Sequence, residues 1–279
     1  MMSLTQRSHI ALRWCTKGLL AFCVAISSSM SFATDELHAP FTALLSKHVV
    51  TINDGASTQV DYAGFKASKS SLNTYLATLA SVSQTTFDGW DSHTQLAFLI
   101  NAYNAYTINF ILTRYPDLDS IRDLGGFFSS PWKQEVAPLL GDTRTLDEIE
   151  HTMIRGGNKY NEPRIHFAVN CASVGCPALR EEAYLGSTLE SQLQAQTVRF
   201  LSDVSRNYMK GDTLYISKIF DWYGDDFALG WKGVSSRNAF MLLYKDALNL
   251  SQSQQKKLAD GEADVEFLDY NWSLNSTGK

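Results

Sequence analysis

Two cysteines separated by four residues carry the sharpest chemical signal in the sequence. Cys171 and Cys176 lie in one short segment, with His166 just upstream. A cysteine is intrinsically nucleophilic, but it needs a base or a positive environment to form thiolate at neutral pH. In an extended chain His166 would lie roughly 16 Å from Cys171. A thiol nucleophile with His166 as its base therefore requires the chain to turn back at Asn170–Ala172.

A disulfide between the same two cysteines is the competing hypothesis. Four intervening residues are compatible with a Cys171–Cys176 bridge, which would stabilise the loop modestly by closing it. Composition and an oxidising compartment favour the disulfide over the free thiol. Two cysteines and one histidine do not complete a four-ligand zinc set, so we predict no metal site.

Glu150 is the second candidate, because it lies within the apolar stripe of a helix predicted over Thr145–Arg155. An isolated buried carboxylate is costly, so we expect Glu150 to pair with Arg164 or His166. In the functional hypothesis Glu150 orients a catalytic histidine, with His151 as the reserve base. In the structural hypothesis it is one half of a buried ion pair.

Polar residues around these candidates are expected to support the site. Asn101 and Asn104 stand one turn apart on a buried helix, where an unsatisfied amide would cost about 1–3 kcal/mol. We expect them to tether the cysteine loop or to line a substrate pocket. Asn170 and loop amides would supply oxyanion donors, and Arg164 and Ser173 complete the supporting set.

No cofactor motif is present in the sequence. It contains no phosphate-binding glycine loop, nucleophile elbow or HExxH zinc helix, so we expect no cofactor. Asp221, Asp225 and Asp226 do not match a calcium-binding loop and predict a solvated turn.

The elements that position these residues mix helices and short strands without βαβ regularity. The segment His93–Arg114 is apolar on nearly every side, which indicates a central buried helix rather than a membrane span. Val49–Ile52 and Gln59–Tyr62 flank a turn signal and predict a hairpin. Arg164–Asn170 predicts a strand that enters the cysteine loop. The pattern predicts an α+β fold: one helix-rich domain over residues 34–279, with a small, mainly antiparallel sheet.

The first 33 residues predict a secretory signal peptide. Arg7, Arg13 and Lys17 precede an apolar stretch and a small-residue tail that ends at Ala33. The apolar run of about nine residues is short of the roughly 20 that span a bilayer. We expect cleavage after Ala33, a periplasmic or secreted protein, and no membrane span after cleavage.

The net charge of the chain indicates which kinds of molecule it could bind. The chain of 279 residues carries 24 Lys+Arg and 29 Asp+Glu, and loss of the three basic residues before Thr34 would change its net charge from −5 to −8. An acidic chain lacks the footprint that phosphate backbones require, so we predict no nucleic-acid partner. Cleavage would also remove Cys15 and Cys23, leaving Cys171 and Cys176.

Several blocks of the sequence together resemble the bacterial branch of the family known as domain of unknown function 547. These blocks are Ala97–Tyr106, Leu146–His151, Pro163–Ser173, Cys176–Arg180, Ser217–Phe227 and Tyr270–Asn275. The resemblance supplies no activity, but it implies an exported form here. It also implies that plant members keep a cysteine matching Cys171 with serine at the position of Cys176, which leaves the thiol and disulfide hypotheses equally open.

Two functions are therefore expected. The first is a cysteine-dependent hydrolase or acyl transferase that acts on a small-molecule, amide or peptide-like substrate. In it, Cys171 is the nucleophile, His166 the base and Glu150 the orienting group. The alternative is a non-catalytic binding or interaction module braced by a Cys171–Cys176 disulfide.

Overall fold

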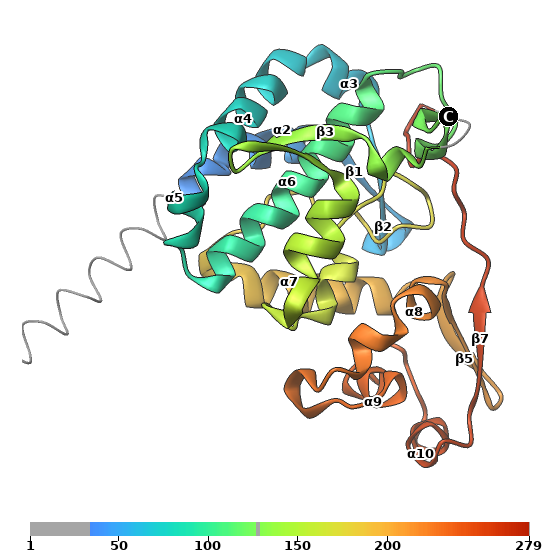
Figure 1. Ribbon diagram of the computed structural model, residues 1–279. Helices are drawn as coiled ribbons and strands as arrows, with labels where there is room; N and C mark the ends of the chain where they lie inside the picture. The colour runs from blue at the N-terminus through green and yellow to red at the C-terminus, as the bar shows by residue number, and fades with distance from the viewer. Residues whose placement is uncertain (1–33, 127–128, 279) are drawn as a thin grey trace, which may run out of the picture.

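The computed structural model describes residues 34–126 and 129–278 (Figure 1). The predicted signal peptide, with Cys15 and Cys23, lies outside these residues. The helices are α2 (Ala39–His48), α3 (Tyr62–Ala67), α4 (Lys69–Ser81), α5 (Gln84–Asp88), α6 (Ser92–Leu112), α7 (Leu189–Leu201), α8 (Ile219–Trp222), α9 (Arg237–Leu243) and α10 (Gln252–Asp260). The strands are β1 (Val49–Ile52), β2 (Ser57–Val60), β3 (Glu135–Leu139), β4 (Asp142–Thr145), β5 (Asn207–Lys210), β6 (Thr213–Ser217) and β7 (Asp264–Leu268).

Helix α6 forms the centre of the larger hydrophobic core, as predicted. It begins after Asp91, whose side chain accepts hydrogen bonds from the backbone N–H groups of His93 and Thr94, and nearly all of its 21 residues are buried. Helices α4 and α7 and strand β3 pack around it. Within the described ranges, no helix combines the length and apolarity needed to cross a membrane.

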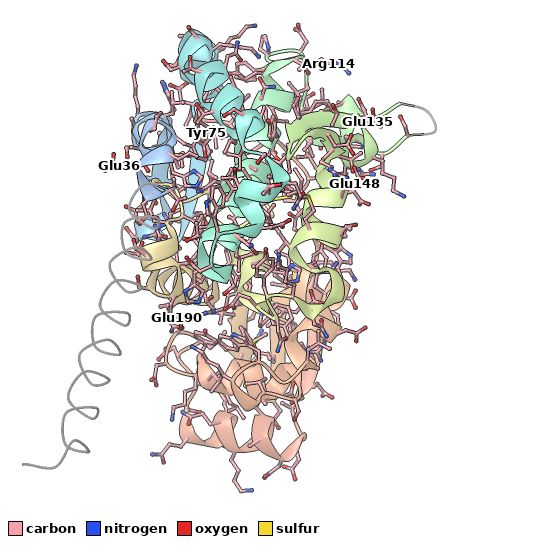
Figure 2. The ribbon with its side chains drawn as sticks, turned by 60° about the vertical axis from the view of Figure 1, so that its left-hand side comes forward. Glu36, Tyr75, Arg114, Glu135, Glu148 and Glu190 are labelled. Carbon is pink, nitrogen blue, oxygen red and sulfur yellow. A yellow bond between two sulfur atoms is a disulfide. The ribbon has the colours of Figure 1, made fainter. Side chains whose placement is uncertain are left out.

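Helices α2 and α4 cover one side of this core. The ring of Phe41 from α2 stacks on Tyr75 from α4, with ring centroids 4.8 Å apart. The Tyr75 hydroxyl lies 2.7 Å from Nδ1 of His38. Figure 2 shows Tyr75 in the interior, whereas the charged ends of Glu36, Arg114 and Glu135 lie at the surface.

A second, smaller core lies in the C-terminal part of the chain, and α7 connects the two. Leu189 and Leu193 at the start of α7 belong to the core around α6, whereas Phe200 and Leu201 at its end belong to the second core. There Phe200 stacks on Phe167, with ring centroids 4.9 Å apart. Figure 1 shows α8, α9 and α10 on the other side of α7 from α6.

Three small sheets hold the strands in the described part of the chain. β1 and β2 form the predicted hairpin, in which Val49 lies opposite Val60. β3 pairs antiparallel with β4, and β6 lies between an antiparallel β5 and a parallel β7. The α+β prediction is confirmed, but the strands are divided among separate sheets rather than gathered in one.

The predicted strand over Arg164–Asn170 is wrong. Residues Pro163–Phe167 form a 3-10 helix, because Pro163 suits a first helical turn and the side chain of Glu162 accepts a hydrogen bond from the N–H of Arg164. The predicted helix over Thr145–Arg155 starts with the expected capping box between Thr145 and Glu148. Its Glu148–Ile154 part is wound as a π-helix.

After β7 the chain returns to the N-terminal half of the molecule (Figure 1). The N–H of Leu274 donates to the carbonyl of Asp119 at 2.7 Å, and the N–H of Asn275 donates to Ala172 at 3.1 Å. The Tyr62 hydroxyl donates to the side-chain oxygen of Asn275 at 2.8 Å. The C-terminal segment is thereby fixed against the cysteine loop, and it carries Tyr270 and Trp272 with it.

Candidate functional site

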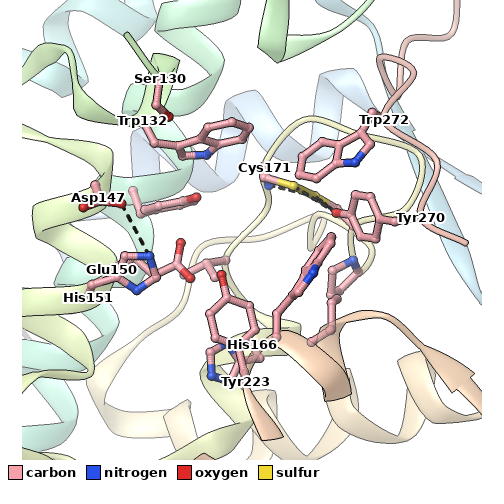
Figure 3. Close-up of a pocket in the computed structure, with 16 residues that line it drawn as sticks. Ser130, Trp132, Asp147, Glu150, His151, His166, Cys171, Tyr223, Tyr270 and Trp272 are labelled. Atoms are coloured by element: carbon pink, nitrogen blue, oxygen red, sulfur yellow. Dashed lines mark hydrogen bonds and ion pairs between the residues drawn. A yellow bond between two sulfur atoms is a disulfide. The ribbon is translucent and has the colours of Figure 1, made fainter. Parts of the chain in front are cut away.

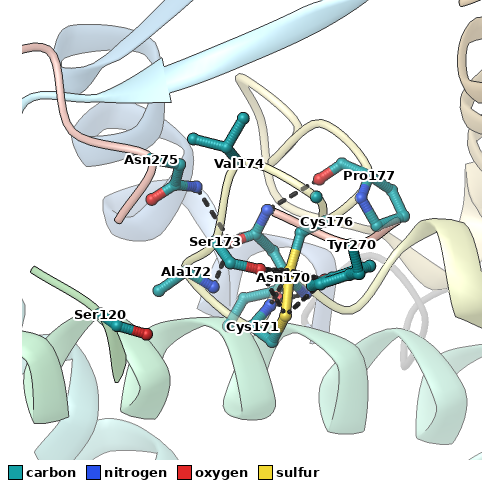
Figure 4. The surroundings of a disulfide bond; sticks show 12 residues. Ser120, Asn170, Cys171, Ala172, Ser173, Val174, Cys176, Pro177, Tyr270 and Asn275 are labelled. Atoms are coloured by element: carbon teal, nitrogen blue, oxygen red, sulfur yellow. Dashed lines mark hydrogen bonds between the residues drawn. A yellow bond between two sulfur atoms is a disulfide. The ribbon is translucent and has the colours of Figure 1, made fainter. Parts of the chain in front are cut away.

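The cysteine loop is closed by a disulfide. The sulfurs of Cys171 and Cys176 are bonded, and their Cα atoms lie 6.1 Å apart. Figure 4 shows Ser173 and Tyr270 beside the bridge. The Ser173 Oγ lies 3.3 Å from each of the two sulfurs, and the Tyr270 hydroxyl lies 3.1 Å from the Cys171 sulfur. The part of the chain that the structure describes places no histidine in hydrogen-bond contact with either sulfur.

The loop turns back where a thiol mechanism would require it. Ala172 has φ 62°, in the left-handed region that L-residues seldom adopt. The side-chain oxygen of Asn170 accepts a hydrogen bond from the N–H of Ala172 at 2.9 Å, and its amide nitrogen donates to the carbonyl of Pro177 at 2.8 Å. The Asn170 side chain therefore holds the ends of the loop together and stabilises the turn.

Gly175 allows the C-terminal segment to reach the disulfide. A Cβ atom on Gly175 would lie 2.9 Å from atoms of the Tyr270 ring, so a larger residue would push this ring away. On the outer side of the loop, the Arg206 guanidinium donates hydrogen bonds to the backbone carbonyls of Val174, Gly175 and Cys176. The loop is therefore held on both sides.

Asn104 fixes the loop to the central helix. Its amide nitrogen donates to the carbonyl of Ala168 at 3.0 Å, and its oxygen accepts from the N–H of Asn170 at 2.8 Å. Asn101 makes the same two-sided contact one turn earlier, with the backbone of Tyr184. Both buried amides are satisfied, and the expected tether to the cysteine loop is made by Asn104.

A cavity of about 280 Å³ lies beside the disulfide (Figure 3). Its wall combines the two cysteines with aromatic, acidic and imidazole groups from both halves of the chain. The lining residues are Tyr103, Ser130, Trp132, Asp147, Glu150, His151, His166, Val169, Cys171, Cys176, Pro177, Ile219, Trp222, Tyr223, Tyr270 and Trp272. The three candidates Cys171, His166 and Glu150 thus meet in one cavity, whereas Asn101, Asn104, Arg164, Asn170 and Ser173 do not line it.

Glu150 is buried in the cavity wall without the partner expected from the sequence. Only 6% of Glu150 is exposed, and the hydroxyls of Tyr103 and Tyr223 hydrogen-bond to its carboxylate. Burial, reinforced by the charge of Glu150, raises the pKa of Tyr103 and of Tyr223 well above the ordinary value. Both phenols therefore stay protonated and act as donors.

Arg164 is committed elsewhere, so the expected Arg164–Glu150 pair is not formed. Its side chain is fully buried, with Nη2 2.6 Å from a carboxylate oxygen of Glu162 and 2.6 Å from one of Glu190. The guanidinium also lies 4.6 Å from the ring centroid of Trp231. Arg164 fixes the 3-10 helix to α7 and takes no part in the cavity.

His166 is held by Asp226 rather than by Glu150. Its Nε2 lies 2.7 Å from Oδ2 of Asp226, and its ring stacks on Tyr223 at a centroid distance of 4.0 Å. Burial lowers the pKa of His166, although the hydrogen bond to Asp226 opposes that effect. A neutral ring that donates to a carboxylate must carry its proton on Nε2.

Asp226 is the end of a longer charged network. Arg155 donates to both of its oxygens, with Nε at 2.6 Å and Nη2 at 3.1 Å. Burial alone would raise the pKa of Asp226, but the hydrogen bonds from His166 and Arg155 outweigh burial and hold it well below its usual range. The prediction of a solvated turn here is wrong for Asp226, because its charge is matched inside the protein.

His151, the reserve base, has both ring nitrogens engaged. A guanidinium can only donate, so the 2.6 Å contact from Nη1 of Arg155 makes Nδ1 of His151 an acceptor. Its Nε2 lies 3.5 Å from Oδ1 of Asp147. His151 therefore lines the cavity as a fixed polar group.

Sequence reasoning missed Asp226, Arg155 and the aromatic wall. Asp226 and Trp222 lie in the family-like block Ser217–Phe227, and Tyr270 and Trp272 lie in the terminal one. Their place in these two blocks was the one sign in the sequence that they could be functional. No residue pattern within either block predicts that it faces Glu150 across a cavity.

The family match includes the residues on one side of the cavity. Residues 87–201 match the family described as "Protein of unknown function, DUF547". The chain resembles the DUF547 family over this segment. Comparisons with curated proteins and with solved structures gave no match. The DUF547 segment contains α6, Glu150 and the disulfide loop, whereas Trp222, Tyr223, Tyr270 and Trp272 on the facing wall lie beyond it.

The tether by Asn104 leads to a first prediction. Asn104→Ala leaves two buried backbone groups of the cysteine loop without partners, and we expect the free energy of unfolding to fall by about 2–4 kcal/mol. Urea denaturation measures the change. Asn109→Ala is the matched control on the same helix, because Asn109 contacts only the partly buried Lys69 amine through its side chain; we expect a loss of about 0.5 kcal/mol or less. Equal losses for the two variants would contradict the tethering role.

Proposed function

We propose that this protein binds a small organic ligand in the aromatic cavity, and that the Cys171–Cys176 disulfide braces one wall of that cavity. This is the binding-module hypothesis, narrowed to a small molecule. The proposal rests on one observation, the convergence of six aromatic side chains on one concave site. They are Tyr103, Trp132, Trp222, Tyr223, Tyr270 and Trp272.

Four of these rings form a contiguous group on one side of the cavity. Trp272 lies 5.7 Å from Trp132, 5.7 Å from Trp222 and 4.6 Å from Tyr270, measured between ring centroids. Trp222 is 44% exposed, although it is a large apolar residue. Concave, mainly apolar sites with a few polar groups are typical of small-molecule binding.

The polar groups of the cavity favour binding over thiol chemistry. Cys171 has no free thiol while it is bonded to Cys176, and its sulfur contacts hydroxyls. His166 is oriented by Asp226, and both nitrogens of His151 are engaged. A nucleophile needs a base within hydrogen-bond reach, and no such pair is assembled in the described residues.

Tryptophan signals give a direct test of the binding proposal. A library of small soluble fragments is added to isotope-labelled protein, and the indole N–H resonances are followed by NMR after assignment with single Trp→Phe variants. We expect fragments that bind to shift Trp132, Trp222 and Trp272. Trp90 and Trp231 lie away from the cavity and serve as internal controls. The proposal fails if no fragment binds, or if the shifts are no larger at the cavity tryptophans than at the controls.

A thiol-dependent hydrolase or acyl transferase is the second candidate, because both sulfurs line the same cavity as Glu150 and His166. In this scheme an external dithiol first reduces the disulfide and is itself oxidised to a disulfide. His166, with His151 in reserve, then takes the proton of the Cys171 thiol, and the sulfur attacks the carbonyl of an amide or peptide-like substrate. The C–N bond breaks, the amine leaves with that proton, and water or an acceptor amine cleaves the resulting thioester. Glu150 serves as the orienting group, and Asn170 or loop amides supply oxyanion donors.

Alkylation tests the thiol candidate. Native protein is treated with a mild reductant and then with iodoacetamide below pH 7, and labelled sites are mapped by mass spectrometry. An activated nucleophile would be labelled stoichiometrically at Cys171, and the label would disappear in Cys171→Ser. We expect little labelling, because the surroundings of Cys171 contain hydroxyls rather than a cation. Rapid, selective labelling of Cys171 would favour the enzyme instead.

We also propose export of the chain to the periplasm or the extracellular space. The disulfide supports this, since disulfides persist in oxidising compartments, and the bacterial resemblance agrees with it. N-terminal sequencing of protein recovered from the host periplasm or medium is expected to begin at Thr34, after removal of the predicted signal peptide. Recovery of the chain in the cytosolic fraction with residues 1–33 intact would refute export.

A further inference from the structure

We propose that the ligand of the aromatic cavity is a small organic cation with an alkylated ammonium group, for which the Glu150 carboxylate is the counter-ion. This inference rests on the proposed binding function and specifies its ligand. Three observations carry it: the lack of an ion-pair partner for Glu150, the aromatic surfaces that face it, and the absence of lysine and arginine from the described cavity wall.

Arg155 and His166 act electrostatically on Glu150, but neither forms an ion pair with its carboxylate. Tyr103 and Tyr223 donate hydrogen bonds to the carboxylate, but phenols carry no charge. Among the described residues, no lysine, arginine or histidine forms an ion pair with Glu150. A carboxylate that is 6% exposed and lacks a cation is expensive to keep in a folded protein. A bound cation would supply the missing charge.

The nearby cations are committed to other groups. Arg155 holds Asp226 with two hydrogen bonds and also contacts His151. His166 donates to Asp226 as a neutral ring, and burial lowers its pKa. Each would have to give up its hydrogen bonding to Asp226 in order to turn to Glu150. Glu150 is therefore available to a ligand, whereas Asp226 is not.

The aromatic wall suits a cation without hydrogen-bond donors. Aromatic ring faces attract alkylated ammonium groups, and tryptophan does so most strongly. Trp132 and Trp272 lie around the space into which the Glu150 carboxylate points (Figure 3). Trp222 also lines this cavity. The outer part of this wall already contacts a cation, since the guanidinium of Arg122 lies 5.4 Å from the ring centroid of Trp272. Tyr223 contributes its hydroxyl, because His166 and Arg155 cover its ring.

The composition of the wall adds charge selectivity. Its acidic and imidazole groups are Glu150, Asp147, His151 and His166, and the lining contains no lysine or arginine among the described residues. An anionic ligand would meet buried negative charge without a compensating cation. The volume of about 280 Å³ lies at the small end of the roughly 300–1,000 Å³ range of ligand pockets, so the cavity suits a compact ligand.

Three compounds of nearly equal shape test the inference. Choline is the cation, 3,3-dimethylbutan-1-ol is its neutral counterpart, and 3,3-dimethylbutanoate is the anion. Binding to the full chain is measured by titration calorimetry and by the indole N–H shifts of Trp132, Trp222 and Trp272. We expect choline to bind about tenfold or more tightly than the alcohol, and the anion not to bind.

Variants locate the effect at the proposed counter-ion. Glu150→Gln keeps the shape of the side chain and removes its charge, so it should weaken choline about tenfold and leave the neutral alcohol unchanged. Glu148→Gln is the matched control, because Glu148 lies on the same π-helix but outside the cavity, and glutamine can still accept the capping hydrogen bond. It should leave choline affinity unchanged. Circular dichroism and urea denaturation of each variant establish that it is folded.

The outcomes separate this inference from the broader binding proposal. Equal affinities for choline and the alcohol, no choline binding up to tens of millimolar, or unchanged choline affinity in Glu150→Gln would overturn the cation assignment. Neutral fragments that still shift the cavity tryptophans would then leave the small-molecule site intact. If neither choline nor any library fragment perturbs those tryptophans, both proposals fail.

Discussion

The burial of helix α6 on nearly every side is the constraint on which the rest of the structure depends. Each polar group on this helix must find its partner inside the protein. Asn101 and Asn104 do so by binding the backbone of segments far along the chain, at Tyr184 and at Ala168–Asn170. Tyr103 lies between them and reaches Glu150. One turn of a buried helix therefore anchors the disulfide loop and forms part of the cavity wall.

The cavity exists because the C-terminal segment returns to this helix. Hydrogen bonds from Leu274 and Asn275 fix that segment to Asp119 and Ala172, and Gly175 leaves the space that the Tyr270 ring occupies. The disulfide keeps the loop in a shape that these contacts can use. The cavity is thus closed by contacts between residues far apart in the sequence. The geometry of the aromatic wall depends on these segments, which meet only in the folded protein.

Two carboxylates near the cavity, the buried Glu150 and the partly buried Asp226, have different partners. Asp226 is neutralised by Arg155 and oriented against His166, so its charge is satisfied within the protein. Glu150 receives hydrogen bonds from two phenols and no cation. Hydrogen bonds stabilise a carboxylate but do not cancel its charge. This difference makes Glu150, rather than Asp226, the group that a ligand would complete.

The sequence alone determined the elements that depend on near neighbours. The apolar run of α6, the capping box at Thr145 and the β1–β2 hairpin were predictable, because capping, turn formation and periodic burial act within a few residues. Tertiary structure decided the partners. The segment after Pro163, predicted as a strand, forms a 3-10 helix in the folded protein. Arg164 in this helix binds Glu190 from α7 instead of Glu150. Charge pairing and cavity walls join residues far apart in the chain, so their geometry arises only when the chain folds.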